Sequence, residues 1–144
     1  MNDNLRLTST VICDDVLANA AGRVTLYSVF RDLYADAYPA EVVRLHVVTT
    51  WLNPTPSVQQ VVERVTILSP DQDDELVADV AAQITVRPHT YHTQISRFRT
   101  LVFPAPGAYR VQVHTGTEMA ADIPLFLMAP PDGSGDIETQ EEEV

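Results

Sequence analysis

The chain has 144 residues, of which 45% are hydrophobic and 20% charged, and a length of this order is typical of one domain with its own core. The formal net charge is −11, so the phosphates of nucleic acids and anionic membrane surfaces repel the molecule as a whole. We therefore expect neither nucleic acid nor a membrane as a partner.

The start of the chain predicts a cytoplasmic location. The first residues, MNDNLRLTSTVICDD, contain no basic segment followed by an apolar run, and no stretch approaches the roughly 20 apolar residues of a membrane span. Cys13 is the only cysteine, which excludes an internal disulfide and any CxxC motif. Its place in the run Val11-Ile12-Cys13 predicts a small buried side chain rather than a nucleophile.

Residues 11–30, VICDDVLANAAGRVTLYSVF, predict a strand, a short loop with its turn at Gly22, and a returning strand. Neighbouring side chains leave an extended strand on opposite faces, so Asp14 and Asp15 are not expected to form a catalytic or metal-binding pair. We expect Arg23, at the start of the returning strand, to form an ion pair with one of them.

The later segments alternate apolar and polar residues with a period of two, which is typical of strands with one buried face. The clearest case is residues 76–86, and residues 61–67 are less regular because Glu63 falls on the inward face. The residues predicted to face the core are Val43, Leu45, Val47 and Trp51; Leu76, Ala78, Val80, Ala82, Ile84 and Val86; Tyr109, Val111 and Val113; and Met119, Ala121, Ile123, Leu125 and Leu127.

About eight short strands separated by turn residues, with no helical period, predict an all-β fold. We expect an antiparallel two-sheet sandwich of the immunoglobulin-like or Greek-key kind over residues 1–129. Residues 130–144, PPDGSGDIETQEEEV, hold six acidic residues and no basic one, and such a composition predicts a flexible acidic tail.

Two motifs resemble those of an uncharacterised bacterial family of small β-sandwich proteins. The first joins CDDVL at 13–17, GRVTLYSVFRDL at 22–33 and Tyr38-Pro39, and the second is a P-G-x-Y-x-V-x-V pattern at 106–113. The turn SPDQDDE at 69–75 departs from the family, which tends to have Pro-Asp-Gly there. The resemblance covers most of residues 10–127 and implies a sandwich fold. It implies no catalytic residue, because the family is of unknown function.

The acidic loop 71–75 is a weak candidate metal site. Asp71, Asp73 and Asp74 offer the oxygen ligands that calcium prefers, but the loop lacks the D-x-D-x-D-G spacing and the distal glutamate of a calcium loop. Histidines stand at positions 46, 89, 92 and 114, and their spacing does not predict a zinc site, since His89 and His92 fall on opposite sides of a strand. We expect no cofactor, and no metal unless this loop provides the site.

A cationic strip is the most informative feature of the sequence. No acidic residue lies between Val80 and Thr117, whereas four arginines and three histidines do. If PAPG at 104–107 closes a four-residue hairpin, Arg97 lies opposite His114, Arg99 opposite Gln112 and Leu101 opposite Arg110, all on one face. The other face then holds the core residues Phe98, Val102, Tyr109, Val111 and Val113.

The favoured interpretation is a non-enzymatic interaction or accessory module. Its strip of Arg97, Arg99, Arg110, Gln112 and His114 would bind an anionic partner, expected to be a protein, or the chain's own acidic tail. Two alternatives stay open. One is a small-molecule or metal-dependent enzyme with a site in the end loops, built from Asp14, Asp15, Asp71, Asp73 or the histidines, and the other is a homo-oligomer formed by pairing of edge strands.

Overall fold

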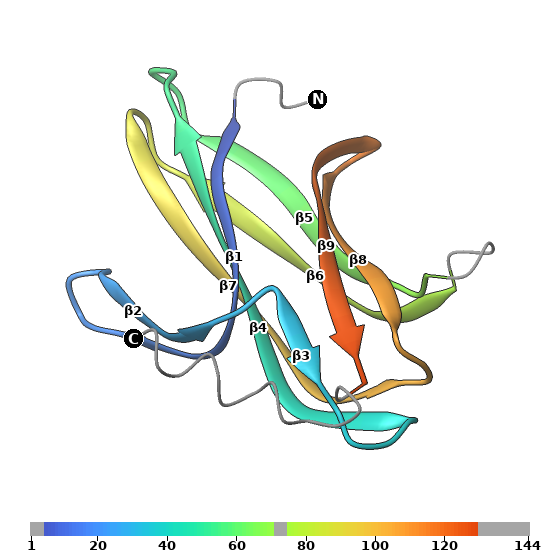
Figure 1. Ribbon diagram of the computed structural model, residues 1–144. Helices are drawn as coiled ribbons and strands as arrows, with labels where there is room; N and C mark the ends of the chain where they lie inside the picture. The colour runs from blue at the N-terminus through green and yellow to red at the C-terminus, as the bar shows by residue number, and fades with distance from the viewer. Residues whose placement is uncertain (1–4, 71–74, 130–144) are drawn as a thin grey trace, which may run out of the picture.

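The structure, a computed structural model, describes residues 5–70 and 75–129, and it confirms the all-β prediction with nine strands and no helix in those residues (Figure 1). None of this part of the chain forms a helix long and apolar enough to cross a membrane. The predicted tail at 130–144 and the loop residues Asp71, Asp73 and Asp74 lie outside the described residues. The strands are β1 (Arg6–Ala18), β2 (Val24–Val29), β3 (Asp32–Tyr34), β4 (Ala40–Asn53), β5 (Gln59–Leu68), β6 (Leu76–Val86), β7 (Thr90–Phe103), β8 (Gly107–Thr115) and β9 (Glu118–Met128).

The strands form two sheets that face each other across a shared core (Figure 1). The first sheet has the order β2-β1-β4-β7, and the second has the order β3-β9-β8-β5-β6. Neighbouring strands are antiparallel except β3 and β9, which are parallel, so the prediction of a purely antiparallel fold is wrong at that edge. The chain crosses from the first sheet to the second between β2 and β3, and β3 therefore joins β9 without a hairpin.

The core is built largely from the alternating positions that the sequence predicts. Three predicted members, Val43, Leu76 and Met119, are instead half exposed or more. The register of the sheet shifts beside Leu76 and Met119, and such a shift turns a side chain to the opposite face. Confirmed buried members include Leu45, Val47 and Trp51 from β4, Ile84 and Val86 from β6, Tyr109, Val111 and Val113 from β8, and Leu125 and Leu127 from β9.

Two non-glycine residues with a left-handed backbone, Ser28 and Thr100, interrupt the alternation, each with φ 57°. Each stands where the antiparallel ladder skips a residue pair. Beyond Thr100 the two faces of β7 exchange, so that Leu101 is 5% exposed and Val102 is 52% exposed. The prediction that Val102 faces the core and Leu101 the cationic strip is therefore wrong.

The connection between β7 and β8 crosses from one sheet to the other, which corrects the predicted hairpin at 104–107. β7 pairs with β4, whereas β8 pairs with β5 and β9. The Tyr109 hydroxyl donates to the Ala105 carbonyl oxygen at 2.7 Å and accepts a hydrogen bond from the Ala105 N–H at 3.2 Å, which fixes the crossing to the start of β8. Turn residues specify that the chain reverses, but not which sheet receives the next strand.

Candidate functional site

The five residues of the predicted strip lie on two different sheets. Arg97 and Arg99 belong to β7 and are exposed on the outer side of the first sheet. Arg110, Gln112 and His114 belong to β8 and lie on the outer side of the second sheet, since the alternating residues Tyr109, Val111 and Val113 fill the core. The outer sides of two facing sheets point away from each other, so the predicted strip does not exist as one surface.

The β8 part of the predicted strip is engaged by neighbours on its own sheet. Arg110 Nη2 lies 2.8 Å from Asp122 Oδ2, and Arg110 Nε lies 3.3 Å from Asp122 Oδ1. This guanidinium holds the pKa of the Asp122 carboxyl below its usual range. His114 Nε2 and Gln112 Oε1 are 3.1 Å apart, and Gln112 is buried. The side chains of these three strip residues therefore make their contacts within the second sheet.

The β7 part of the predicted strip is unneutralised. Arg97 and Arg99 are exposed and form no ion pair with any residue that the structure describes. β7 is the edge strand of the first sheet, and the exposed Val102 follows the two arginines along it. The exposed Val43 of β4 lies beside the Thr100 bend. We call Arg97, Arg99, Val102 and Val43 the β7 surface.

Asp14 and Asp15 share one cation, although they were predicted to point to opposite faces. Arg44 Nη2 lies 3.2 Å from Asp14 Oδ2 and 3.6 Å from Asp15 Oδ2, so the predicted partner, Arg23, is replaced by Arg44 of β4. The left-handed Ser28 stands across from this part of β1, and the alternation is lost there. A hydrogen bond to Asp14 raises the pKa of Arg44. The two carboxylates thus share a single guanidinium within the fold.

Cys13, His46 and Asp14 lie together, but their arrangement does not create a nucleophile. Cys13 stands opposite His46 in the pairing of β1 with β4. Burial raises the pKa of the Cys13 thiol, which favours the unreactive protonated form. His46 Nδ1 lies 3.0 Å from the main-chain oxygen of Asp14, not from its carboxylate. The prediction that Cys13 is a small buried side chain is confirmed.

The histidines, which were not expected to form a zinc site, do not come together with other metal-ligating side chains in the described part of the chain. His89 lies in the turn between β6 and β7, and His92 Nε2 lies 2.9 Å from Gln94 Oε1. No group of three or more His, Cys, Asp or Glu side chains within residues 5–70 and 75–129 is placed to hold a metal ion. The calcium alternative at Asp71, Asp73 and Asp74 stays a prediction, because these residues lie outside the described ranges.

Glu63 places a carboxyl group in the core between the sheets, where it is 1% exposed. Its Oε2 accepts hydrogen bonds from Thr49 Oγ1 at 2.6 Å and from Trp51 Nε1 at 2.9 Å, while Oε1 has no partner among the described residues. The sequence indicates the inward direction of Glu63 but not these contacts, since Thr49 and Trp51 belong to the opposite sheet. The contacts link β4 to β5 across the core.

Sequence reasoning missed a seam between the two sheets. β1 pairs with β4 from Arg6 onward but with β2 only from Cys13 onward, which leaves one edge of residues 6–12 without a neighbouring strand in the described chain. β9 pairs with β8 throughout but with β3 only at Phe126–Met128, which leaves one edge of residues 118–125 equally open. The two open edges run side by side (Figure 1), and we call them the β1–β9 seam.

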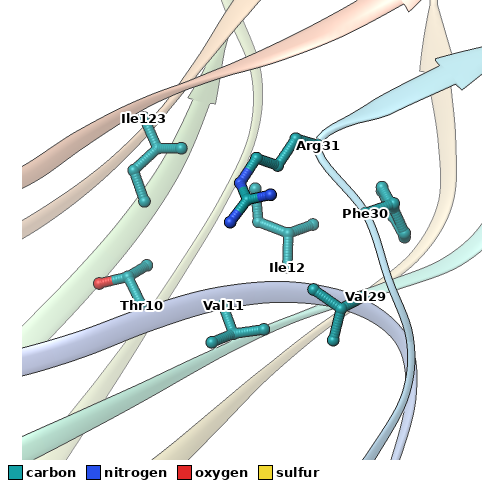
Figure 2. Close-up of a pocket in the computed structure, with 7 residues that line it drawn as sticks. All are labelled: Thr10, Val11, Ile12, Val29, Phe30, Arg31 and Ile123. Carbon is teal, nitrogen blue, oxygen red and sulfur yellow. The ribbon is translucent and has the colours of Figure 1, made fainter.

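Two recesses lie along this seam. The wider one, of about 440 Å³, is lined by Leu5, Arg6, Leu7, Trp51, Thr115, Glu118, Met119 and Ala120. The narrower one, of about 100 Å³, is lined by Thr10, Val11, Ile12, Val29, Phe30, Arg31 and Ile123. Figure 2 shows the Arg31 side chain reaching into the narrower recess between Ile12 and Ile123. The sequence predicts these strands but not their order in the sheets, so it could not reveal the seam.

Solved structures resemble the chain in fold at low sequence identity. The alkylpurine DNA glycosylase AlkC of Pseudomonas fluorescens, bound to DNA containing an abasic site analog, has a TM-score of 0.57 at 10% identity over 88% of this chain and 31% of its own. A β-glucosidase of Listeria innocua has a TM-score of 0.53 at 14% identity, over 86% of this chain and 16% of its own. The β-D-glucoside glucohydrolase of Trichoderma reesei has a TM-score of 0.53 at 13% identity, over 85% and 18%.

These likenesses concern the fold alone, because the chain spans less than a third of each of these proteins and shares few residues with them. None of the curated proteins matches the chain in sequence. Residues 8–128 match the sequence profile of one protein family, described as a family of unknown function (DUF6941). The match extends over both sheets, from β1 to the end of β9.

Proposed function

Since the chain belongs to DUF6941, a family of unknown function, we propose from its geometry that it is a non-enzymatic protein-interaction module. Its β7 surface receives an acidic segment of a partner protein in the bacterial cytoplasm. The observation that carries the proposal is the pair of exposed arginines, Arg97 and Arg99, without an ion pair in the described chain. The guanidinium groups grip carboxylates in a bidentate manner, and the exposed Val102 adds apolar contact.

The scaffold in this proposal is an immunoglobulin-like sandwich. Two facing sheets with one core and a crossing between β7 and β8 support it. So does the hydrogen bond from the Tyr109 hydroxyl to the main chain of Ala105, which resembles the tyrosine corner of such sandwiches. A rigid scaffold of this kind suits recognition, because it holds an edge strand in place with little ordering left to occur on binding.

The local charge supports an acidic partner. Arg44, the nearest other arginine across the β4–β7 pairing, is already engaged by Asp14 and Asp15. Arg97 and Arg99 therefore stay available on a molecule whose net charge is −11. A small cationic surface on an acidic protein directs an acidic partner to one place, because the rest of the surface repels it. Exposed contacts of this kind weaken with added salt.

The experiment compares proteins captured from the source cells by three full-length chains. These are the unaltered chain, Arg97→Glu with Arg99→Glu, and a control with the same change of charge, Arg23→Glu with Arg87→Glu, at two exposed positions away from the β7 surface. We expect a partner to bind the unaltered chain and the control, to be lost from the Arg97/Arg99 variant, and to elute with salt. Equal capture by all three chains would refute the proposal.

The chain's own tail is the second candidate for the β7 surface. Residues 130–144 carry six acidic residues, and the last described residue, Ala129, directly follows β9. A synthetic peptide of residues 130–144 distinguishes the two occupants. If the tail is the occupant, the added peptide binds the chain weakly, because it competes with the attached copy at high local concentration. If a partner is the occupant, the peptide leaves capture of the partner unchanged.

A further inference from the structure

We propose that the β1–β9 seam is a second binding site, which takes an extended segment of a partner protein as an additional strand beside β1. The position for this strand is in line with β2, whose pairing with β1 ends at Val29, so that residues 6–11 of β1 have no neighbouring strand on that side in the described chain. An added strand would lie about 4.8 Å from β1 and cover the recesses between the sheets.

The backbone of β1 offers hydrogen-bonding groups to such a strand. The Ile12 carbonyl oxygen accepts a hydrogen bond from Phe30 N–H at 3.0 Å, so Ile12 directs its polar groups away from β4 and toward the seam. In an antiparallel ladder, alternate residues direct both N–H and C=O to the same edge. Thr10 therefore presents its N–H and C=O to the seam as well. Because the Ile12 carbonyl oxygen is already bonded to Phe30 N–H, the N–H and C=O of Thr10 and the N–H of Ile12 are the template for strand addition.

The facing edge of β9 is less suited to pairing, which assigns the added strand to β1. The N–H of Phe126 donates to the Arg31 carbonyl oxygen at 3.0 Å, away from β8. Pro124, two residues earlier, belongs to the same edge, and proline has no N–H to donate. A proline on the outer edge is a common protection against unwanted pairing. β1 has no proline between residues 6 and 12.

The recesses specify the side chains of the occupant. Ile12, Phe30 and Ile123 make the narrower recess largely apolar, whereas Arg6, Thr115 and Glu118 make the wider one mixed, with Leu7 and Trp51 as its apolar part. Side chains on one face of an added strand enter these recesses at alternate positions. The matching segment is therefore extended, with β-branched apolar residues at alternate positions that face the narrower recess and the apolar part of the wider one.

The charges at the two ends of the seam specify acidic flanks. Arg31 lines the narrower recess and Arg6 the wider one, and neither forms an ion pair within the described residues. Glu118 is the only acidic residue in either lining. A segment with a carboxylate at each end complements both guanidinium groups. The occupant is thus an extended, alternating apolar segment with acidic flanks, from another protein.

The test uses full-length chain and a fluorescent peptide of sequence EVTVTVTE. We expect saturable binding that an N-methylated version of the peptide lacks, because methylation removes the backbone donors and keeps the side chains. Titration followed by NMR should shift the amide signals of Thr10 and Ile12. Arg31→Gln should weaken binding about tenfold, whereas the control Arg87→Gln should not. Thr10→Pro, checked for folding by circular dichroism, removes the donor on β1 and should also weaken binding.

The outcomes separate this site from the β7 surface and from other occupants. Arg97→Glu with Arg99→Glu should leave binding of EVTVTVTE unchanged, and this control keeps failure of the β7 proposal distinct from failure of this one. The seam proposal is overturned by equal binding of the N-methylated peptide or by no binding up to ~1 mM. It is also overturned if the peptide of residues 130–144 displaces the probe, which assigns the seam to the chain's own tail. A dimer of the chain that Thr10→Pro abolishes would assign it to a second copy.

Discussion

At the scale of single residues, Glu63 places an ionisable carboxyl group inside the core, where removal from water is costly. A buried carboxyl group loses its hydration, and the fold returns only two hydrogen bonds to it, from Thr49 and Trp51. The same two bonds satisfy the indole N–H of Trp51 and the hydroxyl of Thr49, whose other acceptor, the Gln94 carbonyl oxygen, lies at 3.5 Å. Glu63 therefore acts as a hydrogen-bond acceptor between the sheets, a role that a neutral acceptor oxygen can also fill.

Two substitutions at Glu63 separate these effects. Glu63→Ala leaves the Trp51 N–H unpaired, leaves Thr49 only its long contact with the Gln94 carbonyl oxygen, and opens a cavity, so we expect the free energy of unfolding to fall by about 2–5 kcal/mol. Glu63→Gln keeps an acceptor oxygen for Thr49 and Trp51, so we expect a change within about 1 kcal/mol. Urea unfolding followed by the fluorescence of Trp51, the only tryptophan, measures both. An equal loss in the two variants would show that the carboxylate charge itself stabilises the core.

At the scale of strands, the crossing between β7 and β8 depends on a close approach at Gly107. A Cβ atom added to this residue would lie 2.7 Å from Pro70 Cγ, and the backbone has φ 154°. Pro70 directly precedes the segment at 71–74 that lies outside the described residues. Glycine is required here because any side chain would meet the proline ring.

We expect Gly107→Ala to lower the free energy of unfolding by about 1–3 kcal/mol, because contact and backbone strain add. Gly116→Ala is the matched control, since Gly116 has φ 62° and no atom within 4 Å of the added Cβ. It should cost about 1 kcal/mol from backbone strain alone. In the Gly107→Ala background, Pro70→Ala should recover part of the loss. If Gly107→Ala costs no more than Gly116→Ala, the contact with Pro70 is unimportant.

Strand alternation explains how much of the fold the sequence could predict. Tyr109, Val111 and Val113 are buried as expected, because side-chain direction along a strand is a local property. The choice between a β7–β8 hairpin and a crossing is not local, since it depends on which sheet accepts β8. Ser28 and Thr100 adopt left-handed backbones without being glycine, so no residue type marked the change of face at Leu101 and Val102.

For the candidate surfaces, too, the sequence predicts which side chains are exposed but not which strands lie side by side. Arg97 and Arg99 are exposed, as their alternation with Phe98 suggests. Their supposed neighbours on β8 depended on a strand pairing that does not form, and the partner of Asp14, Arg44, depended on one that the sequence does not reveal. The β1–β9 seam follows from strand order alone. Long-range pairing, rather than any single residue, is the information missing from the sequence.

At the scale of the whole molecule, excess negative charge opposes folding. The chain has 20 acidic residues against nine arginines. Within the described residues, Arg44 pairs with Asp14 and Asp15, Arg64 pairs with Asp79, and Arg110 pairs with Asp122. All of these side chains are about a third to a half exposed, so each pair contributes roughly 0–1 kcal/mol. Repulsion among the remaining acidic groups is spread over many pairs, and we expect it to be larger in sum.

Salt screens both the ion pairs and the repulsion among acidic groups. The balance between them decides whether added salt raises or lowers the melting temperature. The Debye length falls from about 30 Å at 0.01 M salt to about 8 Å at 0.15 M, which removes long-range repulsion while short ion pairs keep part of their attraction. We therefore expect the melting temperature to rise over this range at constant pH, as measured by circular dichroism. Glu141→Gln with Glu142→Gln and Glu143→Gln removes three of the 20 acidic residues at positions outside the described part of the chain, and should reduce the rise. A melting temperature that falls with salt would mean that the ion pairs at Arg44, Arg64 and Arg110 outweigh the repulsion, and that the net charge of −11 is not a burden on the fold.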